Sequence, residues 1–114
     1  MLFRSRFVVA EIIREKALMY LHEEVPHGIA VEIELFEEKK SLTKITASII
    51  CERSAHKKII IGKGGKKIKG IGKAAREEIE ALLGTKVFLE LWVKVRENWR
   101  NNDNILLNLG YKDR

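Results

Sequence analysis

Residues 59–68 have the sequence IIIGKGGKKI, in which three isoleucines lead into a glycine-lysine turn and then into a basic segment. Glycine adopts backbone conformations that other residues avoid, so the turn at residues 62–65 can be sharp and can bring its N–H groups close to another molecule. Lys63, Lys66 and Lys67 place positive charge at the same point. A helix that begins after the turn adds the positive end of its dipole. The stretch therefore predicts a contact with phosphate groups.

Positive charge is concentrated around this turn. Residues 53–76 contain nine of the 22 Lys and Arg residues and no Asp or Glu, whereas the rest of the chain holds 13 basic and 16 acidic residues. The net charge of +6 thus comes from one block, and such blocks attract polyanions. A solvated helix face without a partner is the other interpretation of a charge run. The glycine turn at the centre of this block favours the polyanion.

Length and composition indicate one folded domain over residues 1–114, with 46% hydrophobic and 33% charged residues. No uncharged stretch approaches the roughly 20 residues that span a bilayer.

Cys51 is the only cysteine, so no intrachain disulfide can form, and we expect a cytoplasmic protein with this side chain buried. The three histidines lack metal-ligand spacing. We expect neither a metal nor a cofactor.

The first half of the chain has one helical and two strand patterns. Apolar residues at helical spacing predict a helix over residues 5–24, with Ser5 as its N-cap and Pro26 ending it. Apolar and polar residues alternate at 31–35 and again at 45–51, as in strands with one buried face. We expect these two strands to pair as an antiparallel hairpin.

The second half contains the turn and the elements around it. A short helix over residues 56–61 is expected to end at Gly62, and a longer helix begins near Lys66, with Ile68, Ile71, Ala75, Ile79 and Leu82 on its apolar face, and ends at Gly84. Gly70 and Gly72 weaken that helix, which predicts that something packs closely against it. A third strand follows from residue 87, and a last short helix is expected near residues 103–109.

This order of elements predicts the fold class. Strands and helices do not alternate strictly, which favours an α+β fold with a three-stranded sheet and helices packed on one face, plus a short C-terminal helix.

The nucleotide-binding loops of enzymes do not fit the turn. No window satisfies Gly-x-x-x-x-Gly-Lys-Ser/Thr, and the glycines at 62, 64 and 65 do not have the Gly-x-Gly-x-x-Gly spacing of a dinucleotide site. No Ser-His-Asp or Cys-His set stands out for nucleophilic catalysis. We therefore expect a binding protein and no enzyme. A purely structural turn between two helices is the remaining alternative.

What fits is Gly-x-x-Gly joining two helices, the second of them basic at its start. This resembles the loop of the KH module, which clamps the backbone of about four nucleotides. A helix and two strands before the loop, and one strand after it, correspond to the type II KH arrangement.

Further segments resemble the C-terminal domain of the Era GTPases, and the resemblance spans residues 6–111, leaving 1–5 and 112–114 as flexible ends. The segments that carry the resemblance are RFVVAEIIREK at 6–16, EVPH at 24–27, VEIE at 31–34, IIGKGG at 60–65, LWVKV at 91–95, NWR at 98–100 and LGY at 109–111.

The resemblance implies a target that composition and spacing do not define. It implies single-stranded RNA at the 3′ end of small-subunit ribosomal RNA, and a role with the small ribosomal subunit in its assembly. It also implies a GTPase domain as partner in the full-length protein and peripheral membrane association. This chain has no phosphate-binding loop of its own, so GTP hydrolysis is not carried over to it.

The expected RNA site centres on the turn. Residues 62–65 would hold the sugar-phosphate backbone, lysines would neutralise phosphates, and isoleucines, including Ile49 or Ile50 from the second strand, would offer a floor for bases. Hydrogen bonds along the strand edge would recognise those bases. The full set expected to bind RNA is Ile49, Arg53, Lys57, Lys58, Ile60, Ile61, Gly62, Lys63, Gly64, Gly65, Lys66, Lys67, Ile68 and Lys69.

Other interpretations stay open from the sequence. Trp92 either stacks on a base or packs under the terminal helix, and the role of Trp99 is undefined. Arg96 and Arg100 extend the RNA track in one interpretation. The chain is alternatively a KH-type protein-interaction or general RNA-chaperone module without ribosomal RNA specificity, in which an acidic face with Glu32, Glu34, Glu37 and Glu38 docks protein partners.

Overall fold

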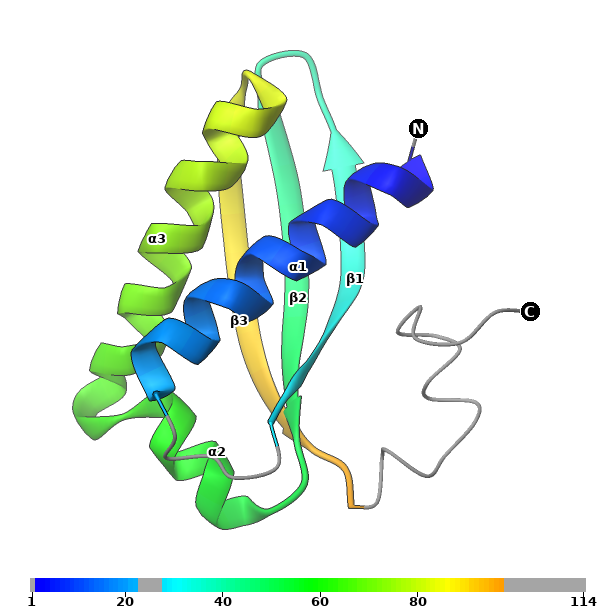
Figure 1. Cartoon of the computed structure of the whole chain (residues 1–114). Helices are drawn as coiled ribbons and strands as arrows, with labels where there is room; N and C mark the ends of the chain where they lie inside the picture. Colours follow the sequence, from blue (N-terminus) through cyan, green and yellow to red (C-terminus); the bar gives the residue numbers. More distant parts are fainter. Residues whose placement is uncertain (1, 23–27, 98–114) are drawn as a thin grey trace.

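A computed structural model describes residues 2–22 and 28–97 of the chain (Figure 1). The elements follow the expected order. They are α1 (Leu2–Leu21), β1 (Ala30–Glu38), β2 (Leu42–Cys51), α2 (Ser54–Ile61), the 3₁₀ turn η1 (Lys63–Gly65), α3 (Lys66–Leu83) and β3 (Lys86–Val95).

The three strands form one mixed sheet in the order β1-β2-β3. β1 is antiparallel to β2, which confirms the expected hairpin. β3 is parallel to β2, in unbroken register from Leu42 opposite Lys86 to Cys51 opposite Val95. β2 is therefore the central strand, and within the described residues β3 has one edge that no strand covers.

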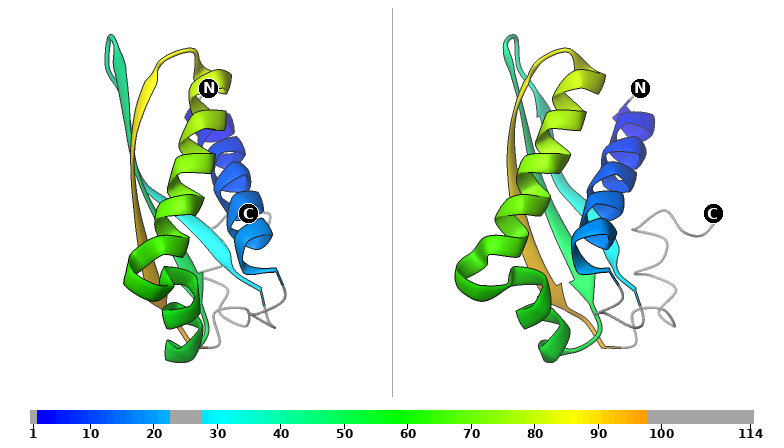
Figure 2. Two further views of the ribbon diagram at one scale, coloured as in Figure 1. Left: turned by 90° about the vertical axis from the view of Figure 1, so that its left-hand side faces the viewer. Right: turned by 60° about the vertical axis from the view of Figure 1, so that its left-hand side comes forward.

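Both long helices lie on the same face of this sheet, as Figure 2 shows. α3 presents Ile71, Ala75 and Ile79 to the sheet, and all three are fully buried. α1 adds Val9, Ile13 and other apolar side chains to the same core. The α+β sandwich with helices on one face is thus confirmed. Among the described residues α1 and α3 cover this one face, and each strand has a second face directed to the opposite side.

Two arginines attach α1 to β1 and to the residue that precedes it. The Arg14 Nε donates a hydrogen bond of 2.9 Å to the carbonyl of Ile29, and the Arg6 Nη1 donates one of 3.3 Å to the carbonyl of Ile33. These bonds join side chains to backbone far apart in the sequence, so they fix the direction of α1 across the sheet. Both arginines have a structural role in this molecule.

The face of the sheet opposite α1 and α3 carries a polar network. The buried Ser48 on β2 donates its hydroxyl hydrogen to Glu34 Oε2 over 2.8 Å, and Lys94 on β3 pairs with the same oxygen. The hydrogen bond from Lys94, opposed by partial burial, and the bond from Ser48 hold the pKa of Glu34 below its usual range. Arg96 lies 3.5 Å from Glu32. Two of the four carboxylates proposed to form an acidic docking face are therefore paired with cations.

The ends of α1 differ from the expectation. The helix begins at Leu2, so Ser5 lies inside it and is not its N-cap, and residues 3–5 belong to the helix. The helix ends at Leu21, where His22 takes a positive φ of 54° and donates its N–H to the carbonyl of Leu18 over 2.9 Å. This stop comes before Pro26, which lies outside the described residues. Propensity rules identified the helix but placed both of its ends too late.

Two leucines, Leu35 and Leu82, are exposed although the sequence pattern places them on buried faces. A register shift between Ile33 and Leu35 reverses the alternation of β1, so Leu35 is 37% exposed and Phe36 is buried against the core. A bulge of this kind inserts one extra residue and turns the following side chains over. Leu82, expected on the buried face of α3, is exposed near the end of that helix.

The third strand has the expected alternation. Val87 and Val93 are buried, Leu89 and Leu91 pack against the core, and Phe88 and Trp92 are exposed on the opposite face. The expected C-terminal helix at 103–109, Trp99 and Arg100 lie outside the described residues. Within residues 2–22 and 28–97, no helix is both long and apolar enough to cross a membrane.

Gly70 is the point at which α1 and α3 approach each other. A Cβ atom there would lie 2.5 Å from Cε2 of Tyr20, on the last turn of α1. The sequence expectation that something packs closely against a helix glycine is therefore met by the Tyr20 ring. At Gly72 a Cβ atom would meet only Leu91 Cδ1, at an ordinary 3.6 Å.

We predict that Gly70→Ala and Tyr20→Ala are coupled. In the Tyr20→Ala background, Gly70→Ala should stabilise the domain by about 1 kcal/mol, the difference in helix propensity. In the parent the ring must leave its place, so the same change should stabilise the domain less or destabilise it. A urea-denaturation cycle measures the coupling. Equal effects of Gly70→Ala in both backgrounds would show that the ring does not pack on this glycine.

Candidate nucleic-acid interface

The Gly-Lys-Gly-Gly turn joins α2 to α3 through three glycines with positive φ. The backbone angles are φ 77° and ψ 173° at Gly62, φ 65° and ψ 19° at Gly64, and φ 77° and ψ 15° at Gly65. Side-chain-bearing residues rarely adopt such angles, which explains why glycine stands at these positions. The isoleucine run before the turn is helix α2, as the sequence predicted, and Gly62 ends it.

Two glycines of the turn are open to approach. No atom lies within 4 Å of where a Cβ would stand at Gly64 or Gly65, whereas at Gly62 that position is 2.9 Å from Lys67 Cβ. Gly62 is thus required by packing inside the turn. Gly64 and Gly65 leave room for another molecule to contact the backbone.

The backbone N–H groups of the turn divide into two classes. The N–H of Gly62 donates to the Lys58 carbonyl over 2.9 Å, and that of Gly65 donates to the Gly62 carbonyl over 3.1 Å. Within the described part of the chain, the backbone carbonyls do not accept from the N–H groups of Lys63 and Gly64. These two groups lie at the exposed tip of the turn, beside the N-terminus of α3, where an anionic group is stabilised by the helix dipole.

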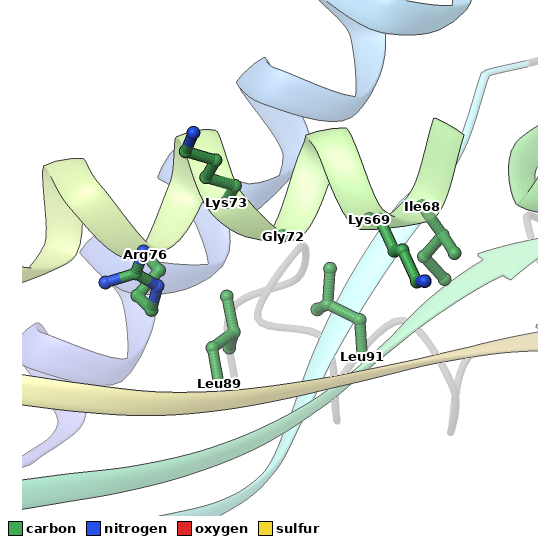
Figure 3. A pocket seen from close by; sticks show the side chains of 7 residues that line it. All are labelled: Ile68, Lys69, Gly72, Lys73, Arg76, Leu89 and Leu91. Carbon is green, nitrogen blue, oxygen red and sulfur yellow. The ribbon is translucent and has the colours of Figure 1, made fainter. Parts of the chain in front are cut away.

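An open groove of about 360 Å³ runs between α3 and β3 (Figure 3). The α3 side consists of positions spaced along one helix face, and the β3 side consists of two leucines on the face that also meets the core. The lining residues are Ile68, Lys69, Gly72, Lys73, Arg76, Leu89 and Leu91.

The side chains of this groove have distinct directions in Figure 3. Leu89 and Leu91 rise from β3 toward the helix, and Lys69 and Arg76 reach from α3 toward the strand, while the amine of Lys73 points away from the strand. Gly72 stands opposite the leucines and has no side chain to fill the space between them. The groove therefore has an apolar floor and cationic groups along its helical wall.

The groove begins close to the turn, because Ile68 and Lys69 lie in the first turns of α3 and the Gly-Lys-Gly-Gly segment directly precedes that helix. From Ile68 to Arg76 the helix axis advances about 12 Å. Turn, basic helix face and leucine floor thus form one continuous surface that alternates between charge for phosphates and apolar area for rings.

The carboxylate of Glu80 joins α3 to β3 near the distal end of this surface. Glu80 on α3 accepts a hydrogen bond of 2.9 Å from the Val87 N–H on β3 through Oε2, and one of 3.2 Å from Arg76 Nη1 through Oε1. The bond from Val87, opposed by desolvation, and the charge of Arg76 hold the pKa of Glu80 below its usual range. Glu80 therefore ties the end of α3 to the start of β3.

The expected site residues occupy three kinds of position. Lys63, Gly64 and Lys66 are exposed at the turn, and Ile68 and Lys69 line the groove. Gly62, Gly65, Ile61 and Lys67 are half-buried around the turn. Lys57 and Lys58 are exposed on α2, and Arg53 precedes the N-terminus of that helix, about 13.5 Å along its axis from Gly62. The first two groups lie together, and Arg53 lies apart from them.

The expectation that Ile49 and Ile60 form a floor for bases is wrong. Both have 0% exposed surface and belong to the core. Ile50, the other candidate, also has 0% exposed surface. β2 is the central strand and has no free edge, and of the two edge strands β3 is the one that borders the groove.

Five residues of the groove were missing from the expected site. They are Gly72, Lys73, Arg76, Leu89 and Leu91. Lys73 and Arg76 were visible as members of the basic block, and Gly72 was visible as a glycine inside a helix. No sequence signal distinguished Leu89 and Leu91 from core leucines, because their partial exposure depends on the parallel pairing that places β3 beside α3.

Cys51 is buried in the core, and burial raises the pKa of its thiol. Among residues 2–22 and 28–97, no three His, Cys, Asp or Glu side chains are grouped as a metal would require.

Comparison with known proteins agrees with this geometry. A family model described as KH domain matches residues 24–100. The GTPase Era of Alkaliphilus oremlandii is 61% identical over 109 residues, which cover 94% of this chain and 37% of that protein. The GTPase Era of Clostridioides difficile is 56% identical over 112 residues, covering 96% of this chain and 38% of that protein. The chain thus spans little more than a third of these relatives.

Solved structures give the same result. A variant of Aquifex aeolicus Era bound to GDP and AlF4⁻ superposes with a TM-score of 0.88 at 45% identity, covering 95% of this chain and 37% of that one. A second Era structure, in complex with MgGDPNP and nucleotides 1506–1542 of 16S ribosomal RNA, has the same score, identity and coverage. From the match over residues 24–100 and this agreement in structure, the chain belongs to the KH domain family and is similar to the KH part of Era GTPases.

Proposed function

We propose that this chain binds single-stranded RNA in the groove between α3 and β3, with the Gly-Lys-Gly-Gly turn holding the sugar-phosphate backbone at one end. The observation that carries the proposal is the continuity of three features on one surface. These are the exposed N–H groups of Lys63 and Gly64, the cationic wall of α3 and the leucine floor of β3. Each meets a different chemical part of a nucleotide.

The geometry of the groove assigns the phosphates, base faces and base edges of the RNA to different protein groups. Phosphates approach the N–H groups of the turn and the amines of Lys63, Lys66 and Lys69, where charge and the helix dipole favour anions. The flat faces of bases rest on Leu89 and Leu91. Base edges meet the uncovered edge of β3, whose backbone groups can donate and accept hydrogen bonds. The role is binding rather than catalysis, in the cytoplasm.

The finer target is the 3′ end of small-subunit ribosomal RNA. Support comes from the similar Era protein whose solved structure contains nucleotides of 16S ribosomal RNA. We extend this to a role with the small ribosomal subunit in its assembly and to a GTPase domain as partner in a full-length protein. Peripheral membrane association stays a proposal that rests on the resemblance alone.

The competing role, a protein-docking module that uses the acidic face, is weakened by the pairing of Glu32 and Glu34 with Arg96 and Lys94.

The double variant Lys63→Asp/Gly64→Asp should lose most of its affinity for single-stranded RNA. The change places two carboxylates where phosphates bind, and we expect a loss of about tenfold or more, with the salt slope of the affinity falling by about 0.7 for each phosphate that the protein no longer neutralises. Fluorescence anisotropy with a labelled RNA of the 16S 3′ end, at several salt concentrations, measures both quantities. The fold should persist, because the space around Gly64 is open and Asp tolerates its left-handed angles.

A matched control is available at the β1–β2 turn. Lys39→Asp/Ser41→Asp causes the same change in net charge at exposed positions of that turn. We expect affinity within about threefold of the parent, since a surface charge beyond the Debye length of about 10 Å is screened. Equal losses in the two double variants would mean that net charge, and not the Gly-Lys-Gly-Gly turn, governs binding.

Gly72→Ala should change stability and RNA binding in opposite directions. The added methyl group would stand 3.6 Å from Leu91 Cδ1, an ordinary contact that the fold accommodates, and replacing a helix glycine stabilises by up to about 1 kcal/mol. The same methyl group fills the space between α3 and the leucine floor, so RNA affinity should fall. Thermal denaturation and anisotropy test the pair of effects. A stabilised variant with undiminished affinity would exclude the groove as the site of the bases.

A further inference from the structure

Among the described residues Arg76 is the one arginine that lines the groove, and it stands at the end farthest from the Gly-Lys-Gly-Gly turn. Its Nη1 donates to Glu80 Oε1 over 3.2 Å, one helical turn further along α3. The two side chains are 38% and 28% exposed. The guanidinium therefore faces solvent in the groove while one of its nitrogens is held.

Glu80 is itself fixed from the opposite side. Its second oxygen accepts the N–H of Val87, a backbone group of β3, over 2.9 Å. The carboxylate is thus bound at both oxygens, and the hydrogen bond from Val87 lowers its pKa below the usual range. A side chain held in this way limits the directions that Arg76 can take, in contrast to the long exposed lysines nearby.

The donors of Arg76 that Glu80 does not engage suit a ligand with two adjacent hydrogen-bond acceptors. A guanidinium carries five N–H donors in a planar fork, and Glu80 engages the fork at Nη1. The edge formed by Nε and Nη2 remains able to donate two parallel hydrogen bonds. Such an edge matches two adjacent acceptors, as in O6 and N7 of guanine or two oxygens of a phosphate.

The surroundings of Arg76 favour a base over a phosphate. Arg76 reaches down beside Leu89, which rises from β3 toward it (Figure 3). A base lying with its flat face on Leu89 presents its edge to the guanidinium. Phosphates have their own cationic partners nearer the turn, in Lys63, Lys66 and Lys69. Adenine has a donor where guanine has O6, so this contact discriminates between the two purines.

We propose that Arg76 recognises a guanine base at the distal end of the groove, and that Glu80 is the positioning residue that orients its guanidinium for this contact. The inference rests on the proposed RNA-binding function and adds a base preference to it. Removal of the bidentate hydrogen bonds is expected to cost about tenfold in affinity for the guanine-containing RNA, within the range typical of such pairs.

The test uses a set of oligouridine hexamers, each with one guanine or one adenine at a different position, bound to the chain and its variants. The parent should prefer guanine over adenine by about tenfold at one position. Arg76→Lys keeps the charge but removes the fork, so this preference should vanish and the guanine and adenine hexamers should bind equally at that position. Glu80→Gln can still accept from Val87 but no longer attracts Arg76, so the preference should fall to less than half.

Glu78→Gln serves as the matched control. Glu78 lies on the same helix and its change alters net charge equally, but its carboxylate pairs with Lys16 of α1 over 2.8 Å. This variant should keep the guanine preference of the parent. Circular dichroism confirms that each variant is folded before binding is compared.

The outcomes separate this inference from the proposed function. A parent that binds none of the hexamers would contradict RNA binding itself. A parent that binds RNA without preferring guanine at any position would overturn the role of Arg76 alone. An equal weakening of all hexamers by Arg76→Lys would mean that Arg76 contacts a phosphate. A preference retained in Glu80→Gln would overturn the positioning role of Glu80.

Discussion

The burial of one face of α3 against the sheet is the constraint on which the rest of the structure depends. Ile71, Ala75 and Ile79 are fully buried, and each isoleucine stabilises the fold by roughly 1.5–3 kcal/mol on burial. With that face fixed, the neighbouring stripe of Ile68, Gly72 and Arg76 must face the gap beside β3. Packing of the core thereby determines which side chains are available to a ligand.

The strand on the other side of the gap is fixed just as firmly. β3 pairs with β2 in parallel over its full length, and the Val87 N–H bonds to Glu80 at the end of α3. Helix and strand are therefore held together at the distal end, while at the proximal end the three positive-φ glycines turn the chain from α2 into α3. The contact at the distal end preorganises that part of the groove, so an RNA strand that binds there requires less rearrangement of the protein.

Much of this arrangement could be predicted from the sequence. The Gly-Lys-Gly-Gly turn, the helices on each side of it, the hairpin of β1 and β2 and the alternation of β3 all follow from local patterns, and the structure contains each of them. The start of α1, the bulge in β1 and the exposure of Leu82 could not be predicted, because they depend on tertiary contacts. The burial of Ile49 and Ile60 had the same origin, since a run of isoleucines carries no sign of which members face the core.

The leucine floor of the groove was the largest part of the candidate site that the sequence analysis did not predict. Leu89 and Leu91 follow the pattern of ordinary core residues, and only the parallel placement of β3 at the edge of the sheet leaves them open to the groove. Local sequence patterns do not specify whether a strand pairs in parallel with a strand much earlier in the chain, because that pairing brings together residues 44 positions apart. The chemistry of the turn was thus predictable, and the surface that receives the bases was not.

The central claim is that RNA lies between α3 and β3, and nuclear magnetic resonance of the isotope-labelled chain titrated with single-stranded RNA tests it most directly. We predict the largest amide shifts at residues 62–65 and 69–76, and intermolecular nuclear Overhauser effects from RNA protons to the methyl groups of Leu89 and Leu91. Shifts and Overhauser effects gathered instead around Phe88 and Trp92, on the opposite face of the sheet, would contradict this claim.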